Sequence, residues 1–340
     1  MSRRLPAEWE AQDGVLLAWP HKNTDWEPLL ADVEAAYCAI IGAILRFETV
    51  LLVVDCAPTV SVKLQSAGID LDQVRLYEIP TDDTWARDFG PLTVMNDNAP
   101  RLLDFTFTGW GGKFPATQDN AVTRMLAKQN AFAPLPLETV DLILEGGGIE
   151  SDGHGTLLTT TACLLNPNRN AQLDRAAVEA ELTRYFGAKR ILWLNHGYLA
   201  GDDTDSHIDT LARLAPKDTL VYQSCTDPAD EHYAALQAMA AELRGFRTME
   251  GAPYRLLPLP WPRPRYDAGD RLPATYANFL IINGAVLVPT YADPADAAAL
   301  AVVAAAFPDR EIIGINCCAL IRQHGSLHCV TMQLPRGVLR

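Results

Sequence analysis

The chain lacks an excess of basic residues, and it lacks a long apolar run. Lys and Arg number 28 against 42 Asp and Glu, which gives a formal net charge of -14. Proteins that bind nucleic acid or an anionic membrane surface use a basic patch, so we expect neither partner. The longest apolar run, Ala297 to Phe307, is shorter than the roughly 20 residues that span a bilayer. An acidic chain instead favours cationic small molecules.

Paired cysteines and the common nucleotide motifs are also missing. The seven cysteines are an odd number without paired spacing, and residues 1–9 lack the apolar run of a signal peptide. We therefore expect a cytosolic protein with reduced thiols. The chain has no P-loop, no G-x-S-x-G, no H-E-x-x-H and no G-x-G-x-x-G after a strand. The triplet Gly146–Gly148 has the wrong spacing for dinucleotide binding.

The hydrophobic pattern predicts a single α/β domain over residues 1–340. Strand pairs alternate with single helices in about five similar blocks, and no linker interrupts them. The β-branched run Thr49–Val54 predicts a strand, and residues 172–186 predict a helix. The segment 253–271, rich in Pro and Arg, predicts an irregular surface loop. The triplet Asp82-Asp83-Thr84 recurs as Asp202-Asp203-Thr204, a short internal repeat.

Four polar positions suggest acid, base and nucleophile chemistry. Cys329 lies in residues 327–332, which alternate like a strand, and a reactive thiol needs a cationic or hydrogen-bonding neighbourhood that lowers its pKa. His207 and Asp209 are two residues apart, so on a strand they share one face. Asp88 follows a basic residue, and Glu145 ends an apolar strand. Each has a plainer interpretation: a packed cysteine, a satisfied histidine, an ion-paired or solvated carboxylate. Together they suit a planar guanidinium cation, which two carboxylates can hold for attack by a thiolate.

The histidines and cysteines near the C-terminus favour a second hypothesis, a non-enzymatic metal-binding module. His and Cys are zinc ligands. Adjacent cysteines do not match the C-x2–4-C spacing of structural zinc sites, so we rank this hypothesis below catalysis. The residues concerned are Cys317, Cys318, His324, His328 and Cys329.

Several ordered motifs resemble the agmatine deiminase family, which belongs with the bacterial-type peptidyl-arginine deiminases in the guanidino-group-modifying superfamily. The similarity runs from Pro6-Ala-Glu-Trp9 almost to the end of the chain. The motifs are Trp85-Ala-Arg-Asp-Phe-Gly-Pro91, Glu145-Gly-Gly, Asn166-Pro-Asn-Arg-Asn170, Thr204-Asp-Ser-His-Ile-Asp209 and Leu327-His-Cys-Val-Thr331.

The resemblance implies a five-bladed α/β propeller, the pentein fold, with pseudo-fivefold ββαβ repeats around a central site. It implies Cys329 as nucleophile and His207 as general acid and base. Asp88 and Asp209 would grip the guanidinium, while Glu145 would orient His207 or contact the substrate. The aliphatic part of the substrate would lie between Trp85 and Trp110.

The implied reaction converts agmatine to N-carbamoylputrescine and ammonia through a covalent amidino-cysteine, with no metal or organic cofactor. The resemblance also implies a homodimer. The chain departs from the family pattern at Gly325-Ser326-Leu327, at Ser206 and Thr210, and at Asp203, where many members have Glu. Asp203 is a candidate contact for the far amine of the substrate.

The sequence leaves several substrates possible. Besides agmatine, they are arginine, a terminal peptidyl-arginine and another alkylguanidine. An α-carboxylate or a peptide carbonyl needs a cationic group or a donor in the pocket. Arg263, Arg265 and Arg271 are the candidates for that group.

Overall fold

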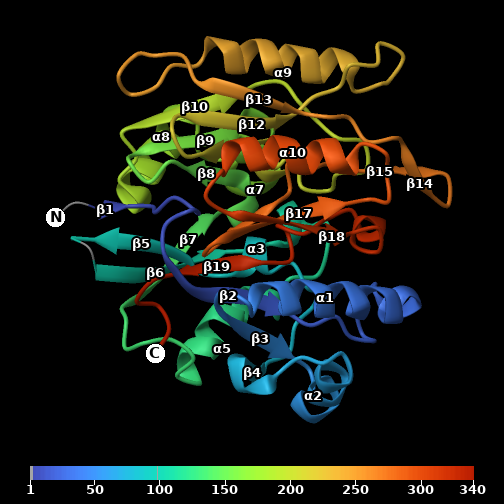
Figure 1. Ribbon diagram of the computed structural model, residues 1–340. Helices are drawn as coiled ribbons and strands as arrows, with labels where there is room; N and C mark the ends of the chain where they lie inside the picture. Colours follow the sequence, from blue (N-terminus) through green and yellow to red (C-terminus); the bar gives the residue numbers. More distant parts are fainter. Residues whose placement is uncertain (1–2, 98) are drawn as a thin grey trace.

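The computed structural model describes residues 3–97 and 99–340, and its fold is mixed α/β (Figure 1). In this part of the chain, the strands form five sheets of three or four strands each. A separate two-stranded hairpin pairs β14 (Arg265–Asp267) with β15 (Asp270–Leu272). Listed in order across each sheet, the strands are β19 (Met332–Pro335), β2 (Gln12–Ala18), β3 (Thr49–Val54) and β4 (Val74–Glu78); β1 (Arg3–Arg4), β5 (Leu92–Asn96), β6 (Ala99–Thr106) and β7 (Leu137–Ile143); β10 (Arg190–Leu194), β9 (Thr156–Thr160) and β8 (Ile149–Ser151); β11 (Ala212–Ala215), β12 (Thr219–Gln223) and β13 (Arg255–Leu259); β16 (Leu280–Ile282), β17 (Ala285–Thr290) and β18 (Glu311–Asn316).

Each of the five sheets combines an antiparallel pair with a parallel pair. A parallel pair needs a crossover, and a helix supplies it each time. These crossover helices are α1 (Leu30–Ile44), α2 (Ala57–Ser66), α5 (Val122–Lys128), α8 (Arg175–Phe186), α9 (Tyr233–Gly245) and α10 (Asp296–Ala306). Shorter helical turns sit in the connections: α3 (Ala86–Phe89), α4 (Gly109–Gly112), α6 (Thr161–Leu164) and α7 (Pro167–Asn170).

Local sequence explains where these elements begin and end. Asp174 caps α8, because its side chain accepts from the Ala177 backbone N–H at 2.9 Å, and Gly187 ends the helix with a φ of 65°. The strand β3 has the predicted bounds, and its apolar residues are buried because β2 and β4 flank it in parallel. The core therefore lies between these sheets and their helices.

Three sequence-based expectations about local structure are wrong. Residues 253–271 were expected to be irregular, but they contain β13, β14 and the first two residues of β15. Pro258 is tolerated in β13 because that strand forms the edge of its sheet. Residues 327–330 form a turn rather than a strand, and the Thr331 hydroxyl closes it by donating to the Leu327 and His328 carbonyls at 3.2 and 3.0 Å. His207 precedes a 3₁₀ turn, Ile208–Thr210, and is not on a strand with Asp209.

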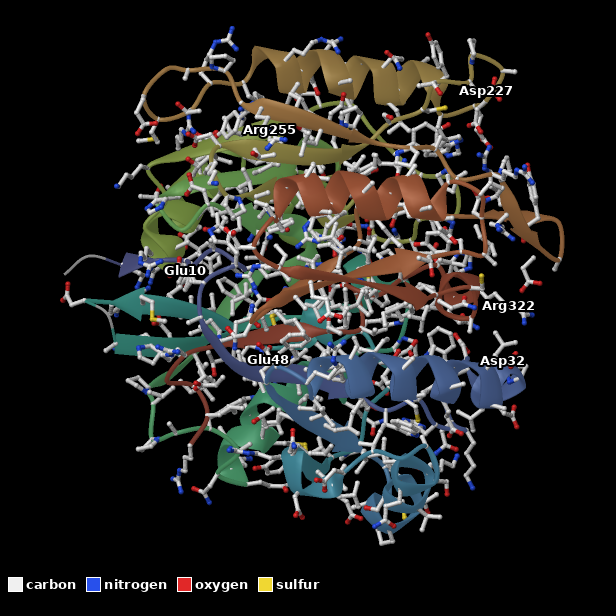
Figure 2. The ribbon with its side chains drawn as sticks, viewed as in Figure 1. Glu10, Asp32, Glu48, Asp227, Arg255 and Arg322 are labelled. Atoms are coloured by element: carbon white, nitrogen blue, oxygen red, sulfur yellow. The ribbon has the colours of Figure 1, made fainter. Side chains whose placement is uncertain are left out.

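The helices also bridge neighbouring sheets. The helix α1, which links β2 to β3, packs on β18 of the next sheet. Asp32 on α1 and Arg322, which follows β18, lie on the same side of the molecule (Figure 2) and border one groove. The C-terminal strand β19 pairs antiparallel with the N-terminal β2, which brings Cys329 back to the first sheet. Among the described residues, no helix has both the length and the apolar character needed to cross a membrane.

Candidate active site

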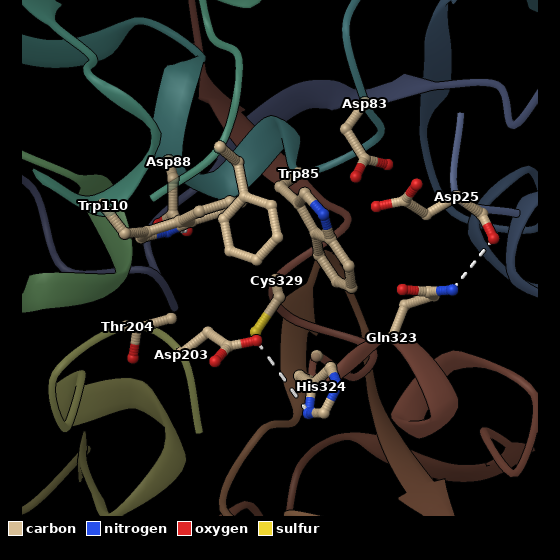
Figure 3. A pocket seen from close by; sticks show the side chains of 12 residues that line it. Asp25, Asp83, Trp85, Asp88, Trp110, Asp203, Thr204, Gln323, His324 and Cys329 are labelled. Atoms are coloured by element: carbon tan, nitrogen blue, oxygen red, sulfur yellow. Dashed lines mark hydrogen bonds and ion pairs between the residues drawn. The ribbon is translucent and has the colours of Figure 1, made fainter. Parts of the chain in front are cut away.

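A pocket of about 130 Å³ opens beside Cys329, and aromatic rings form much of its wall (Figure 3). Trp85 and Trp110 meet edge to face with ring centroids 6.4 Å apart. The structure holds Trp110 in the left-handed region at a φ of 54°, within the Gly-rich turn α4. Such backbone strain is concentrated at functional sites. The lining residues are Asp25, Asp83, Trp85, Asp88, Trp110, Phe114, Asp203, Thr204, Gln323, His324, Gly325 and Cys329.

The Cys329 side chain is 4% exposed, and its sulfur faces polar groups rather than packed hydrocarbon. Its Sγ lies 3.4 Å from Asn278 Oδ1 and 3.9 Å from Asp209 Oδ2. The same Asn278 oxygen accepts from the backbone N–H groups of His328 and Cys329 at 2.9 and 3.3 Å. Asn278, which precedes β16, therefore fixes the turn that carries the thiol. The sequence patterns did not identify this residue.

His207 lies between two carboxylates without hydrogen-bonding to either. Its Nδ1 is 3.6 Å from Asp88 Oδ1, and its Nε2 is 3.7 Å from Glu145 Oε2. Within the described residues, neither ring nitrogen has a hydrogen-bond partner, although the side chain is fully buried. A Cβ added at Gly147 would lie 2.6 Å from His207 Nδ1, 2.9 Å from Asp88 Oδ1 and 3.1 Å from Asp209 Oδ2. The imidazole and the two aspartates therefore converge beside this glycine, which leaves no room for a side chain.

Asp88 is fixed by two donors. The Trp110 indole N–H donates to its Oδ2 at 2.9 Å, and the Gly147 backbone N–H donates to its Oδ1 at 3.0 Å. Burial raises the pKa of Asp88 to about 6; nearby His207 opposes the rise, and the neighbouring Asp209 and Glu145 charges add to it. A bound cation would favour the ionised carboxylate.

Asp209 belongs to a buried chain of polar contacts that continues through His328 and Glu8 to Arg213. His328 Nδ1 donates to Asp209 Oδ2 at 2.8 Å, and His328 Nε2 lies 2.7 Å from Glu8 Oε2. Arg213 Nη2 is 3.0 Å from the same Glu8 oxygen. Although burial opposes it, the His328 hydrogen bond keeps the pKa of Asp209 below its usual value. Asp209 Oδ1 has no partner among the described residues, so one oxygen remains available for a ligand.

Glu145 does not line the pocket. Its two oxygens accept from Arg169 Nε at 3.1 and 2.8 Å, and Arg169 Nη1 binds Asp205 Oδ2 at 2.7 Å. Burial opposes a low pKa, but the nearby His207 ring and the Arg169 ion pair hold the pKa of Glu145 below its usual value. Of the two roles expected for Glu145, this position favours orienting His207.

The electrostatics around the thiol differ from the sequence-based expectation. Burial and the nearby Asp209 and Asp88 carboxylates raise the pKa of Cys329 well above its usual value. Hydrogen bonds with the Ser326 backbone and the Asn278 side chain act in the opposite direction but are the smaller influences. Burial lowers the pKa of His207, yet the Asp88 carboxylate and the Cys163 sulfur outweigh burial and raise it well above its usual value. The Asp88 carboxylate therefore favours the protonated forms of both the Cys329 thiol and the His207 imidazole.

Comparison with known proteins now gives a family. The model of Porphyromonas-type peptidyl-arginine deiminases matches residues 4–335. The chain belongs to this family. The curated agmatine deiminase of Pseudomonas aeruginosa (strain LESB58) is 34% identical over 98% of this chain and 95% of that protein. A C. jejuni agmatine deiminase with substrate bound is 39% identical, with a TM-score of 0.93 over 99% of this chain and 97% of that chain. SxtG, an amidinotransferase from Microseira wollei, shares the fold at 12% identity and a TM-score of 0.54, over 100% of this chain and 99% of that chain.

Two departures from the family motifs have a structural context. Ser206 adopts a φ of 65°, a conformation that glycine reaches without strain, and the family usually has glycine there. Ser326 donates to or accepts from the Tyr291 hydroxyl at 2.9 Å and is buried. A side chain at Gly325 would collide with the Trp85 ring, so this glycine is required by the pocket wall.

The far part of the pocket is acidic. Asp203 Oδ2 lies 3.9 Å from His324 Nδ1, and Asp83 and Asp25 line another side of the same pocket (Figure 3). Asp83 and Asp203 are the matching members of the repeated Asp-Asp-Thr triplets. That repeat was the available signal for Asp83, which the sequence analysis did not single out as a site residue.

The C-terminal metal module is contradicted. Among the described residues, no group of three potential metal ligands is drawn from Cys317, Cys318, His324, His328 and Cys329. Cys317 is buried, and its Sγ donates to the Ile315 carbonyl at 3.3 Å.

The arginines proposed for a substrate carboxylate do not line the pocket either. Arg271 binds Asp230 and Glu231 at 2.6 and 3.0 Å, and Arg265 lies 3.6 Å from Asp293. Arg263 borders a separate, smaller pocket of about 10 Å³. These positions remove the basis for an arginine that selects a carboxylate.

Proposed function

We propose that this protein hydrolyses agmatine to N-carbamoylputrescine and ammonia. The observation that carries the proposal is the convergence of Cys329, His207, Asp88 and Asp209 beside an acidic, aromatic-walled pocket. Relatives named agmatine deiminases match the chain over nearly its full length and add support.

The guanidinium of the substrate would balance the negative charge of the carboxylates in this site. Its N–H groups would donate to Asp88 and to the unpartnered Asp209 Oδ1, so its positive charge offsets both carboxylates. The same charge favours the Cys329 thiolate, whose pKa is raised when those carboxylates are uncompensated. Substrate binding therefore favours loss of the thiol proton to solvent, and in this way the substrate activates the nucleophile.

The reaction then proceeds in two halves. The Cys329 thiolate bonds to the guanidinium carbon, and the His207 imidazolium gives its proton to the leaving nitrogen. Ammonia departs and leaves a cationic amidino-thioether. Neutral His207 next takes a proton from water as the water oxygen bonds to the same carbon. Collapse of this adduct breaks the C–S bond and restores the thiolate. The hydroxyl proton of the adduct leaves to solvent, and the neutral substituted urea is released. Glu145, held by Arg169, would orient the ring during both transfers.

The charge of the pocket favours agmatine over arginine. None of the described residues that line it is Lys or Arg, whereas Asp25, Asp83, Asp88 and Asp203 are all carboxylates. An ammonium at the far end of agmatine suits Asp203, and an α-carboxylate meets like charge. Trp85 and Trp110 supply the faces between which the alkyl chain would lie.

Ammonia release from agmatine, arginine and a terminal peptidyl-arginine tests the substrate assignment directly. We expect turnover of agmatine with arginine far slower, and loss of turnover in Cys329→Ala with the circular dichroism spectrum unchanged. Equal turnover of arginine would overturn the choice of agmatine, and full activity in Cys329→Ala would overturn the nucleophile.

The finer architecture belongs to the same proposal: one domain over residues 1–340, built as a five-bladed propeller. Its support is that contacts connect successive sheets in a ring. Gln129 after α5 donates to Glu78 of β4 at 3.1 Å, and α8, α9, α10 and α1 pack on β1, β10, β13 and β18 of the preceding sheets.

We extend the proposal to a homodimer in the cytosol with a small cationic guanidino substrate. Analytical ultracentrifugation tests the dimer.

A further inference from the structure

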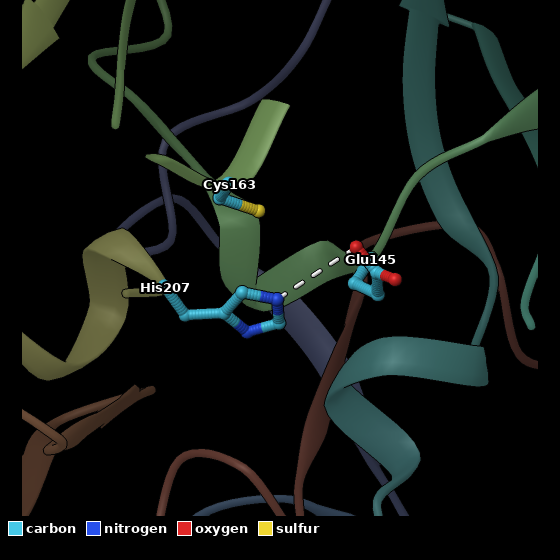
Figure 4. Close-up of side chains that lie close together, drawn as sticks. All are labelled: Glu145, Cys163 and His207. Atoms are coloured by element: carbon cyan, nitrogen blue, oxygen red, sulfur yellow. Dashed lines mark ion pairs between the residues drawn. The ribbon is translucent and has the colours of Figure 1, made fainter. Parts of the chain in front are cut away.

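Behind the pocket, three side chains of metal-ligating type lie close together: Glu145, Cys163 and His207 (Figure 4). One donor atom from each lies within 4.8 Å of the other two, and all three residues are buried. Cys163 comes from α6, Glu145 precedes the Gly146–Gly148 turn, and His207 precedes the 3₁₀ turn that contains Asp209. The deiminase reaction as described uses two of these residues and leaves Cys163 without a function.

The imidazole of His207 supplies an independent sign of a ligand. It is fully buried, and both of its nitrogens lack hydrogen-bond partners among the described residues. Nε2 faces Glu145 at 3.7 Å, and Nδ1 faces Asp88 at 3.6 Å. A metal on Nε2 would satisfy that atom, while Nδ1–H would point at the Asp88 carboxylate. That is the carboxylate–histidine–metal arrangement of protein zinc sites.

The carboxylate ligand is oriented as well. Arg169 Nε donates to both oxygens of Glu145 at 3.1 and 2.8 Å, which fixes the carboxylate plane while leaving a lone pair on each oxygen. Gly148 borders the group, since a Cβ there would come within 3.3 Å of Cys163 Sγ. Glu145 is thus held by Arg169, and the backbone of Gly148 lies beside the Cys163 sulfur.

A second group of potential ligands provides the contrast. Glu8, Glu150 and His328 also lie within ligand distance of one another. There, however, Arg213 already supplies the cation: its Nη2 is 3.0 Å from both Glu8 Oε2 and His328 Nε2, and its Nε binds Glu150. At the Cys163 cluster, Arg169 bonds to Glu145 but not to His207, and both His207 nitrogens lack a hydrogen-bond partner among the described residues, so the imidazole remains open to a metal ion.

We propose that Cys163, His207 and Glu145 form a zinc-binding site and that the bound Zn²⁺ inhibits the enzyme. One thiolate, one imidazole and one carboxylate are ligands that Zn²⁺ takes together, with water as a fourth. Binding releases the Cys163 proton to solvent. The inhibition rests on the proposed function, because a metal on Nε2 prevents His207 from carrying protons; the binding itself does not rest on it.

Competition with a chromophoric chelator tests binding on the full-length protein. We expect one Zn²⁺ per chain in the wild type and in Cys225→Ser, a matched control for a buried thiol. Cys163→Ser and Cys163→Ala should each weaken binding by more than about 100-fold, because even outer-shell partners cost about 10- to 100-fold. Co²⁺ in place of Zn²⁺ should show a thiolate-to-metal charge-transfer band that both Cys163 variants lack.

Ammonia release with and without Zn²⁺ tests the inhibition. The ratio of the two rates is the readout, so a change of basal rate in a variant does not affect it. We expect inhibition of the wild type that a chelator reverses, and at least tenfold resistance in the Cys163 variants. Unchanged zinc affinity in these variants, or zinc binding lost in Cys329→Ser instead, would overturn the site. A wild type that binds zinc yet turns over no guanidine would leave the site standing and overturn only the deiminase function.

Discussion

The two sides of the candidate site are built in opposite ways. On the Asp209 side, His328, Glu8 and Arg213 form a continuous buried chain with distances of 2.7 to 3.0 Å. On the His207 side, the nearest carboxylate oxygens stay at 3.6 and 3.7 Å, and the ring has no hydrogen bond among the described residues. One side holds a carboxylate rigidly, and the other leaves an imidazole that can gain and lose a proton.

This difference matches what each side has to do in the proposed reaction. A carboxylate that grips a cation gains from a fixed position and a low pKa, and the His328 hydrogen bond favours both. A proton carrier needs partners that change between the two halves of the reaction, so permanent hydrogen bonds would hinder it. The carboxylate, whose charge stays constant during the reaction, is therefore held in a fixed position, whereas the imidazole that carries the proton is not hydrogen-bonded.

The largest expected effect comes from the His207 side. Replacing His207 by Asn removes the proton carrier and should lower kcat by about 10²- to 10⁴-fold, the usual contribution of general acid–base catalysis. Steady-state ammonia release measures it. His232→Asn is the matched control, since His232 is also buried and pairs with Asp230 at 2.7 Å, away from the pocket. Equal losses in the two variants would show a folding effect instead of a catalytic one.

A smaller effect is expected on the rigid side. His328→Leu removes the donor to Asp209 and should lower kcat/KM by about 10- to 100-fold, since a hydrogen bond to a charged group contributes about 1.5–3 kcal/mol. His328→Asn can keep a donor near the Nδ1 position and should recover most of the activity. The pKa of Asp209 should rise in His328→Leu, which adds a second protonation to that of Asp88 and should steepen the acid side of its pH profile. An acid side with the same slope as in the wild type would contradict the positioning role.

The pH dependence of the wild type distinguishes the two aspartates. Asp88, with its pKa raised to about 6, is protonated first as the pH falls, whereas Asp209 stays ionised to lower pH. A protonated Asp88 cannot offset the guanidinium charge, so kcat/KM for agmatine should fall about tenfold per pH unit below about 6. The acid limb measured with agmatine checks this; a limb that begins only near pH 4 would contradict it.

The smallest effect is expected at the far end of the pocket. Asp203→Glu adds one methylene and should shift preference towards guanidines with a shorter alkyl chain, by a few-fold rather than by orders of magnitude. Turnover of an alkylguanidine amine series of increasing length measures the shift. Asp82→Glu is the control, because Asp82 belongs to the repeated triplet but borders the neighbouring cavity. Unchanged length preference would remove Asp203 from amine recognition.

Local pattern predicted much of the fold. The bounds of β3 and the end of α8 agree with the structure because burial on both faces and a glycine stop are local signals. The turn at residues 327–330 was not predictable from alternation, because the Asn278 side chain and the Thr331 hydroxyl decide it. The edge strand β13 was missed because its pairing with β12, over 30 residues away, outweighs its prolines.

The sequence by itself determined which functional groups this protein carries and which family they belong to: the thiol, the imidazole and the carboxylates are all legible in its motifs. Only the tertiary structure decided their electrostatic state. His328 reaches Glu8 across 320 positions of sequence, and Asp88 approaches His207 from another segment. Interactions of that range set burial and charge around each group. The raised pKa of Cys329 and the unpaired ring of His207 therefore became visible only once the chain was folded.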